Sequence, residues 1–83
     1  MERENKQAIL DAICAALRLT HNAGRGNALA EIRYIKYVNG TEIARPIFEN
    51  GAGDDGWYDI NITADSGTAI FKDVTRQFLD RVW

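Results

Sequence analysis

The chain has 83 residues, which is enough for one hydrophobic core and excludes a multidomain enzyme. Hydrophobic residues make up 46% of the sequence and charged residues 27%, so the composition excludes intrinsic disorder. The formal charge of -2 excludes binding to nucleic acid or to an anionic membrane by net charge alone. We therefore expect residues 1–83 to form a single domain.

Cysteine usage and hydropathy predict the compartment. The single Cys14 cannot form an intramolecular disulfide, and it lies in an apolar helical stretch where a reduced thiol packs like a small hydrophobe. No apolar run is long enough for a signal-sequence core or a membrane span. We therefore expect a cytoplasmic protein without a targeting segment and without a membrane partner.

The first predicted element is an amphipathic helix from about Glu2 to Thr20, ending near residue 21. Its main apolar residues recur at steps of three and four: Ile9, Leu10, Ile13, Cys14 and Leu17. A second group, three alanines and a leucine, widens the apolar arc: Ala8, Ala12, Ala15 and Leu19. Such a wide arc predicts a helix that is covered on more than one side. Asn22 and Gly24 tolerate the positive φ that ends a helix, and His21 lies in the last turn.

The next segment predicts a β-hairpin. Residues 28–38 are rich in Ile, Tyr and Val and precede Asn39-Gly40, the pair best suited to a two-residue type I′ turn. This turn predicts a register in which Val38 faces Thr41, Lys36 faces Ile43, Tyr34 faces Arg45, and Ile32 faces Ile47.

That register sorts the hairpin into two faces. The predicted core face carries Ala30, Ile32, Tyr34, Val38, Ile43 and Ile47, with Lys36 and Arg45 along the same side. The predicted outer face carries Leu29, Glu31, Arg33, Ile35, Tyr37, Glu42, Ala44, Pro46 and Phe48. The isoleucine face is taken as the core because the charges of the other face are costly to bury together. Pro46 conflicts with a central strand, so we expect a bulge or a strand end near Arg45.

The last third of the chain predicts a strand and a helix. After the loop at 50–56, residues Trp57 to Ala64 alternate Tyr58, Ile60 and Ile62 with polar residues. Thr63, Asp65 and Ser66 offer cap oxygens before a helical stripe made of Ile70, Phe71, Val74, Phe78 and Val82. The order α-β-β-β-α predicts an α+β two-layer sandwich, in which both helices cover one face of a three-stranded antiparallel meander.

No motif fixes a chemistry, so we expect no enzyme, no cofactor and no metal. Cys14 and His21 lie too far apart on one helix to form a nucleophilic pair. The acidic residues Glu49, Asp54, Asp55 and Asp59 do not follow the spacing of a calcium loop and fit a solvated turn better. Weak anion-binding signals occur at Gly24-Arg25-Gly26 and at the helix start Ser66-Gly67-Thr68, where capping is the simpler role.

The outer sheet face is the candidate interaction surface. It is predicted to present Ile35, Tyr37, Phe48, Trp57 and Arg33, which combine aromatic and mixed charged side chains as partner surfaces do. Trp83 either extends this apolar surface or closes the core. The leading hypothesis is a small non-catalytic module that binds a protein partner or a second copy of itself, through this face, through the first helix, or through both.

Two other functions stay open. The order of elements resembles that of double-stranded-RNA-binding domains, which contact RNA through a lysine cluster at the start of the second helix. Here that stretch carries only Lys72, so nucleic-acid binding would depend on the aromatics with Arg25, Arg33 and Lys36. The remote alternative is a minimal metal-dependent enzyme that uses the acidic loop.

Overall fold

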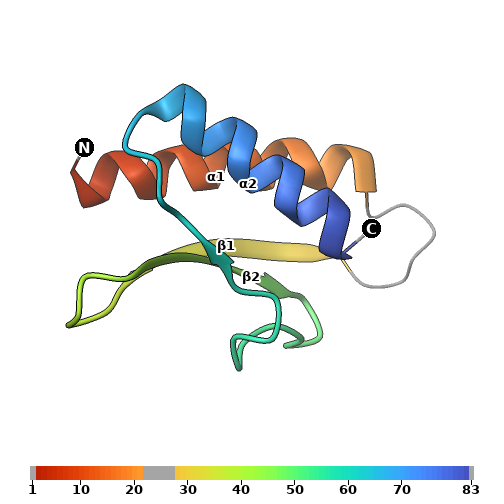
Figure 1. Cartoon of the computed structure of the whole chain (residues 1–83). Helices are drawn as coiled ribbons and strands as arrows, with labels where there is room; N and C mark the ends of the chain where they lie inside the picture. Colours follow the sequence, from red (N-terminus) through yellow and green to blue (C-terminus); the bar gives the residue numbers. More distant parts are fainter. Residues whose placement is uncertain (1, 22–27, 83) are drawn as a thin grey trace.

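The computed structural model describes the backbone of residues 2–21 and 28–82 and the side chains of residues 2–19 and 28–80. The elements follow in the order α1 (Arg3–His21), β1 (Leu29–Lys36), β2 (Glu42–Phe48), β3 (Ile60–Asn61) and α2 (Gly67–Val82). The antiparallel strands form one sheet in the order β1-β2-β3, and both helices lie on the same face of it (Figure 1). The predicted α+β meander with two helices on one face is confirmed.

A capping residue marks the start of α2, whereas Asn22 and Gly24, predicted to end the first helix, lie outside the described residues. Ser66 Oγ accepts a hydrogen bond of 3.2 Å from the backbone N–H of Ala69, which makes Ser66 the N-cap of α2. Ile70, Val74 and Phe78 then point into the core, as the helical stripe predicted. Phe71 of the same stripe is exposed instead, and the side chain of Val82 lies outside the described residues.

The turn between β1 and β2 differs from the prediction. Tyr37 N–H donates to the Thr41 carbonyl over 2.8 Å and Gly40 N–H to the Tyr37 carbonyl over 2.9 Å, so the loop is Val38–Gly40. Gly40 has a φ of 91°, whereas Asn39 keeps a negative φ and accepts the Thr41 N–H with its side chain. This is a type I turn followed by a glycine bulge, the usual three-residue hairpin loop. Asn-Gly suits this loop as well as a type I′ turn.

The longer loop shifts the register of β2 by one residue. Ile32 faces Pro46, Tyr34 faces Ala44, and Ile35 faces Ile43. Because side chains alternate, this shift exchanges the two faces of β2. The predicted faces of β1 were right from Glu31 to Tyr37, but those of β2 were wrong. Ala44, Pro46 and Phe48 lie on the core side, while the side chains that change to the outer side are Ile43, Arg45 and Ile47.

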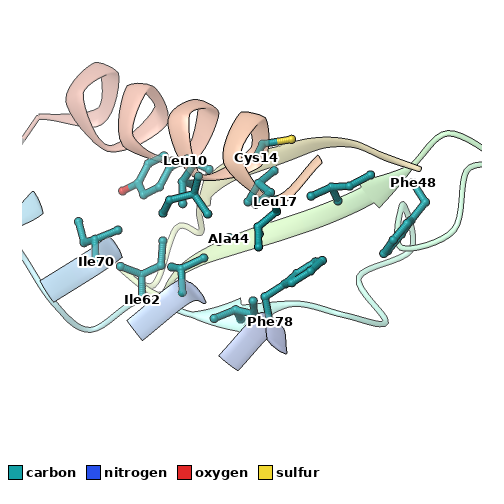
Figure 2. Close-up of a cluster of buried hydrophobic side chains, with 14 residues drawn as sticks. Leu10, Cys14, Leu17, Ala44, Phe48, Ile62, Ile70 and Phe78 are labelled. Carbon is teal, nitrogen blue, oxygen red and sulfur yellow. The ribbon is translucent and has the colours of Figure 1, made fainter. Parts of the chain in front are cut away.

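The predicted surface residue Phe48 therefore lies in the core. Figure 2 shows Phe48 and Phe78 among the side chains of the core cluster. Phe48 is 8% exposed, and its ring lies 6.5 Å from that of Phe78 in α2 and 5.7 Å from that of Tyr58. A bulge between Leu29 and Glu31 also returns Leu29 to the core and leaves Ala30 exposed, which reverses the prediction for both. The remaining core residues come from every element: Leu10, Ile13, Cys14, Leu17, Ile32, Tyr34, Ala44, Ile60, Ile62, Ile70, Val74 and Phe78.

Pro46 is accommodated without the predicted break of β2. Because hydrogen-bonded pairs alternate along the ladder from Tyr37–Thr41, the nitrogen of Pro46 points away from β1. On that side β3 has already ended, since its last pair joins Ala44 to Ile60. Gly53 lies against this edge of β2, because a Cβ on residue 53 would lie 2.1 Å from the Pro46 carbonyl oxygen. The φ of Gly53 is 90°. Only glycine fits both requirements.

The third strand is shorter than predicted. Only Ile60–Asn61 pairs as strand, and the segment from Gly51 to Tyr58 forms turns. The predicted alternation still holds for the side chains, because Ile60 and Ile62 are buried and Tyr58 packs against the core. The alternation of apolar and polar residues therefore predicted which side chains face inward, but it did not predict how many residues of β3 pair with β2.

Candidate interaction surface

The outer sheet face is the surface that the sequence singled out, and the structure keeps three of its five predicted residues on that face. Arg33 and Tyr37 are exposed, and Ile35 is half-buried on the same side. Trp57 is 74% exposed on the turn before β3. Phe48, the fifth residue, packs under the helices instead. The large exposed aromatics of the predicted surface are therefore Tyr37 and Trp57.

Charged side chains of the outer sheet face pair with one another. Arg45 donates to both carboxylate oxygens of Asp59 over 2.9 and 3.1 Å, and to the hydroxyl of Tyr37 over 3.3 Å. The hydrogen bonds that Arg45 donates to Asp59 raise the pKa of Arg45 above its ordinary value. Arg33 pairs with Glu31 over 2.6 Å. The predicted phosphate contact Arg33 thus has an acidic neighbour, and Arg25 lies outside the described residues.

Two isoleucines of the outer sheet face are buried. Ile43 is 3% and Ile47 is 8% exposed, although neither belongs to the core cluster beneath the helices. They lie on the side of the sheet that carries Arg45 and Tyr37. The aliphatic side chains Ile43 and Ile47 are therefore hidden from solvent on this side, while the aromatic rings of Tyr37 and Trp57 are not.

The helices leave a different surface. We use "helix-layer face" for the side of the helices that points away from the sheet: Ala8, Ile9, Ala12, Ala15, Ala16 and Leu19 of α1 and Phe71 of α2. Leu19 is 88% exposed, and Phe71 and the four alanines are also exposed. At 100° per residue, Ala8, Ala12, Ala15 and Leu19 lie opposite Leu10, Ile13 and Leu17, which face the core.

A groove crosses the helix-layer face where the two helices meet. It has a volume of about 380 Å³ and is lined by Ile9, Ala12, Gly67, Thr68, Phe71 and Lys72. Five of these six side chains carry no charge, and Lys72 is the sixth. The alanine and the glycine supply no bulk, so Ile9 and Phe71 border a hollow rather than fill it.

A polar cluster connects α1 to the sheet, and the sequence did not indicate it. Lys6 Nζ lies 2.5 Å from Glu42 Oε1 and 3.3 Å from Asp65 Oδ1, and the Tyr34 hydroxyl donates to the same Glu42 oxygen. Lys6 is buried, on the helical line of Leu10, Ile13 and Leu17. That line is the signal that could have found it: a lysine in register with core residues needs an acidic partner.

The pKa shifts of this cluster follow from its hydrogen bonds. The bonds from Lys6 and then from Tyr34 lower the pKa of Glu42. The bond to Glu42 raises the pKa of Lys6 against the opposing effect of burial. Burial, followed by the bond to Glu42, raises the pKa of Tyr34. All three groups hold the protonation state that suits their partners, so the cluster anchors α1 to the sheet.

A second polar contact protects the free edge of β1. The side-chain amide of Gln7 donates to the Ile32 carbonyl over 2.9 Å and accepts the Tyr34 N–H over 2.8 Å. The amide therefore bonds β1 as the backbone of a neighbouring strand would. This contact blocks part of the edge that another strand would otherwise extend.

The residues that the sequence offered for nucleophilic or metal chemistry are Cys14, His21 and the acidic loop. The Cys14 thiol is buried, and desolvation raises its pKa, which disfavours the reactive thiolate. In the acidic loop, Asp59 binds Arg45 and Asp55 accepts the N–H of Trp57. Within the described residues, no three His, Cys, Asp or Glu side chains lie together as metal ligands would. The side chain of His21 lies outside those residues.

Comparison with protein-family models, with curated proteins and with solved structures returned no match for this chain. In the part of the chain that the structure describes, neither helix combines the length and the apolar character that crossing a membrane requires.

Proposed function

We propose that this chain is a small non-catalytic interaction module that binds a protein partner through its helix-layer face. The observation that carries the proposal is the set of exposed apolar side chains on the helix-layer face, which includes Leu19 and the mainly apolar groove between Ile9 and Phe71. Apolar side chains at the surface are common singly, but a contiguous apolar face with a groove is typical of binding surfaces.

The helix-layer face is a better candidate than the outer sheet face. On the sheet, the isoleucines are buried and the charged groups Arg45 and Asp59 bind each other. On the helices, Leu19 and Phe71 meet solvent, and alanines between them allow close approach of another helix. Tyr37 and Trp57 are also exposed on the sheet side, but only the helices combine exposed apolar side chains with a groove and with alanines.

Site-specific photo-crosslinking tests this proposal. A photoreactive amino acid is placed at Ala12, at the centre of the helix-layer face, and in a control chain at Asn39, at the exposed hairpin tip. Both chains are irradiated in an extract of the native source. We expect a discrete adduct with one protein chain at Ala12 and none at Asn39. No adduct at Ala12, or the same adducts at both positions, would contradict the proposal.

A further inference from the structure

We propose that the partner of the helix-layer face is a second copy of this chain, bound with the two α1 helices antiparallel about a twofold axis. This inference rests on the proposed function and names the occupant of the same surface. It follows from the spacing of the exposed side chains of α1 and from the charges that border them.

The spacing of the exposed residues is that of a helix-pairing seam. Ala8, Ala12, Ala15 and Leu19 follow one another at steps of four, three and four, which is the repeat that brings one face of a helix against another helix. All four are exposed, and Leu19 is the only large one among them. Three alanines allow an axis separation near the short end of the range of about 8–10 Å.

An antiparallel pair matches these side chains by size. A twofold axis requires that each contact occurs twice, with the two residues exchanged between the copies. Setting Ala12 against Ala15 of the second copy then sets Ala8 against Leu19. The large Leu19 meets a small alanine in both places, and no layer contains two large side chains.

The same register matches the charges. Glu4, Asp11 and Arg18 lie at seven-residue intervals along one border of the seam. In the antiparallel register, Asp11 lies beside Arg18 of the second copy, and the contact is repeated across the axis. A parallel pair would set Asp11 beside Ala16 and would form no such ion pair.

The side chains of Asp11 and Arg18 are both accessible to a second copy. Asp11 is exposed and accepts one hydrogen bond, of 2.9 Å, from Gln7. Arg18 is half exposed, and its ion pair with Glu49 is 3.8 Å long. An exposed pair at that distance contributes little to stability. Arg18 can therefore turn to Asp11 of the second copy at small cost.

Charge reversal tests the register. Asp11→Arg brings two cations together at each of these contacts, and Arg18→Asp brings two carboxylates together, so each variant alone repels its own copy. We expect sedimentation equilibrium to show dimers of the wild-type chain, weakened about tenfold or more in either variant. An equimolar mixture of the two variants pairs unlike charges again, so we expect it to form heterodimers as strong as the wild-type dimer.

Glu4→Arg is the matched control. It reverses a charge on the same border of α1, but within the described residues of the facing helix no charged side chain lies opposite position 4 in the proposed register. We expect its dimerisation to be unchanged. Circular dichroism of all three variants checks that each remains folded.

Three outcomes would overturn the inference. The first is a wild-type chain that stays monomeric up to about 1 mM, a concentration at which even a weak dimer is populated. The second is a mixture of Asp11→Arg and Arg18→Asp that fails to associate although both variants are folded. The third is an equal loss in Glu4→Arg. A monomeric chain that still crosslinks from Ala12 to a different protein would overturn only the self-association and would leave the proposed function in place.

Discussion

The two outer surfaces of the molecule treat their apolar residues differently. On the outer sheet face, Ile43 and Ile47 are buried, and Arg45 binds Asp59 and Tyr37 on the same side. On the helix-layer face, Leu19 and Phe71 are exposed. Apolar area that remains in contact with water is available to stabilise an association. Tyr37 and Trp57 remain exposed on the sheet side, so the two surfaces differ in their aliphatic side chains: Ile43 and Ile47 are covered by the fold, whereas Leu19 is not.

The largest expected effect is the difference in stability between variants of Phe48 and of Tyr37. The sequence predicted that both residues lie on one surface. Phe48→Ala removes a ring that packs between Phe78 and Tyr58, so we expect a loss of about 3–5 kcal/mol in the free energy of unfolding. Tyr37→Ala removes an exposed ring and should cost less than about 1 kcal/mol. Urea denaturation measures both. Equal losses would show that the two rings share one environment.

The next comparison exchanges an apolar residue for serine on each outer surface. Ile43→Ser opens a site that is 3% exposed, so we expect a loss of about 2–4 kcal/mol. Leu19→Ser changes a residue that is 88% exposed, and its effect on the unfolding of the monomer should stay within about 0.5 kcal/mol. Sedimentation should show the reverse order, with association lost only in Leu19→Ser. Loss of association in a folded Ile43→Ser chain would identify the sheet as the interface.

The smallest effect concerns the polar cluster, which holds α1 in place beneath the helix-layer face. The folded state lowers the pKa of Glu42, so this carboxylate stabilises the fold above its unfolded pKa of about 4.3 and loses that contribution as pH falls through the folded value. Glu42→Gln should cost about 1–3 kcal/mol at neutral pH.

The pH dependence of the difference in stability between wild type and Glu42→Gln provides a control for this prediction. Because glutamine does not titrate, the difference in stability between wild type and Glu42→Gln should shrink as the pH falls below about 5 and through the lowered pKa of Glu42. Glu4→Gln removes an exposed carboxylate of α1 instead of the partly buried one of β2, and it should change the free energy of unfolding at neutral pH by less than about 0.5 kcal/mol. A constant difference across the acid range would show that Glu42 does not stabilise the fold through its charge.

The sequence was sufficient for the elements and their order, because periodicity and capping residues are local signals. The stripe of α2 and its Ser66 cap, and the wide alanine arc of α1, follow directly from spacing. The core-facing side of β1 could also be predicted, because Ile32 and Tyr34 alternate with charged residues.

The faces of β2 could not be predicted because Asn39-Gly40 fits two hairpin loops that differ by one residue. That single residue reverses every side chain of β2, and it brought Phe48 inside and Ile43 outside. The partners of Lys6 were equally hidden, since Glu42 and Asp65 lie far from it in sequence and meet it only through the fold. Of the residues predicted for the outer surface, Phe48 therefore lies in the core, and the role of that surface and of α1 as contact surfaces stays a prediction.

The outward face of α1 as the meeting point of two chains is the central claim, and amide chemical shifts measured over a dilution series test it most directly. We predict concentration-dependent shifts that are largest at Ala8, Ala12, Ala15 and Leu19, while those of Tyr37 and Trp57 stay constant. Shifts confined to Tyr37 and Trp57, or no shifts at any concentration up to about 1 mM, would contradict the claim.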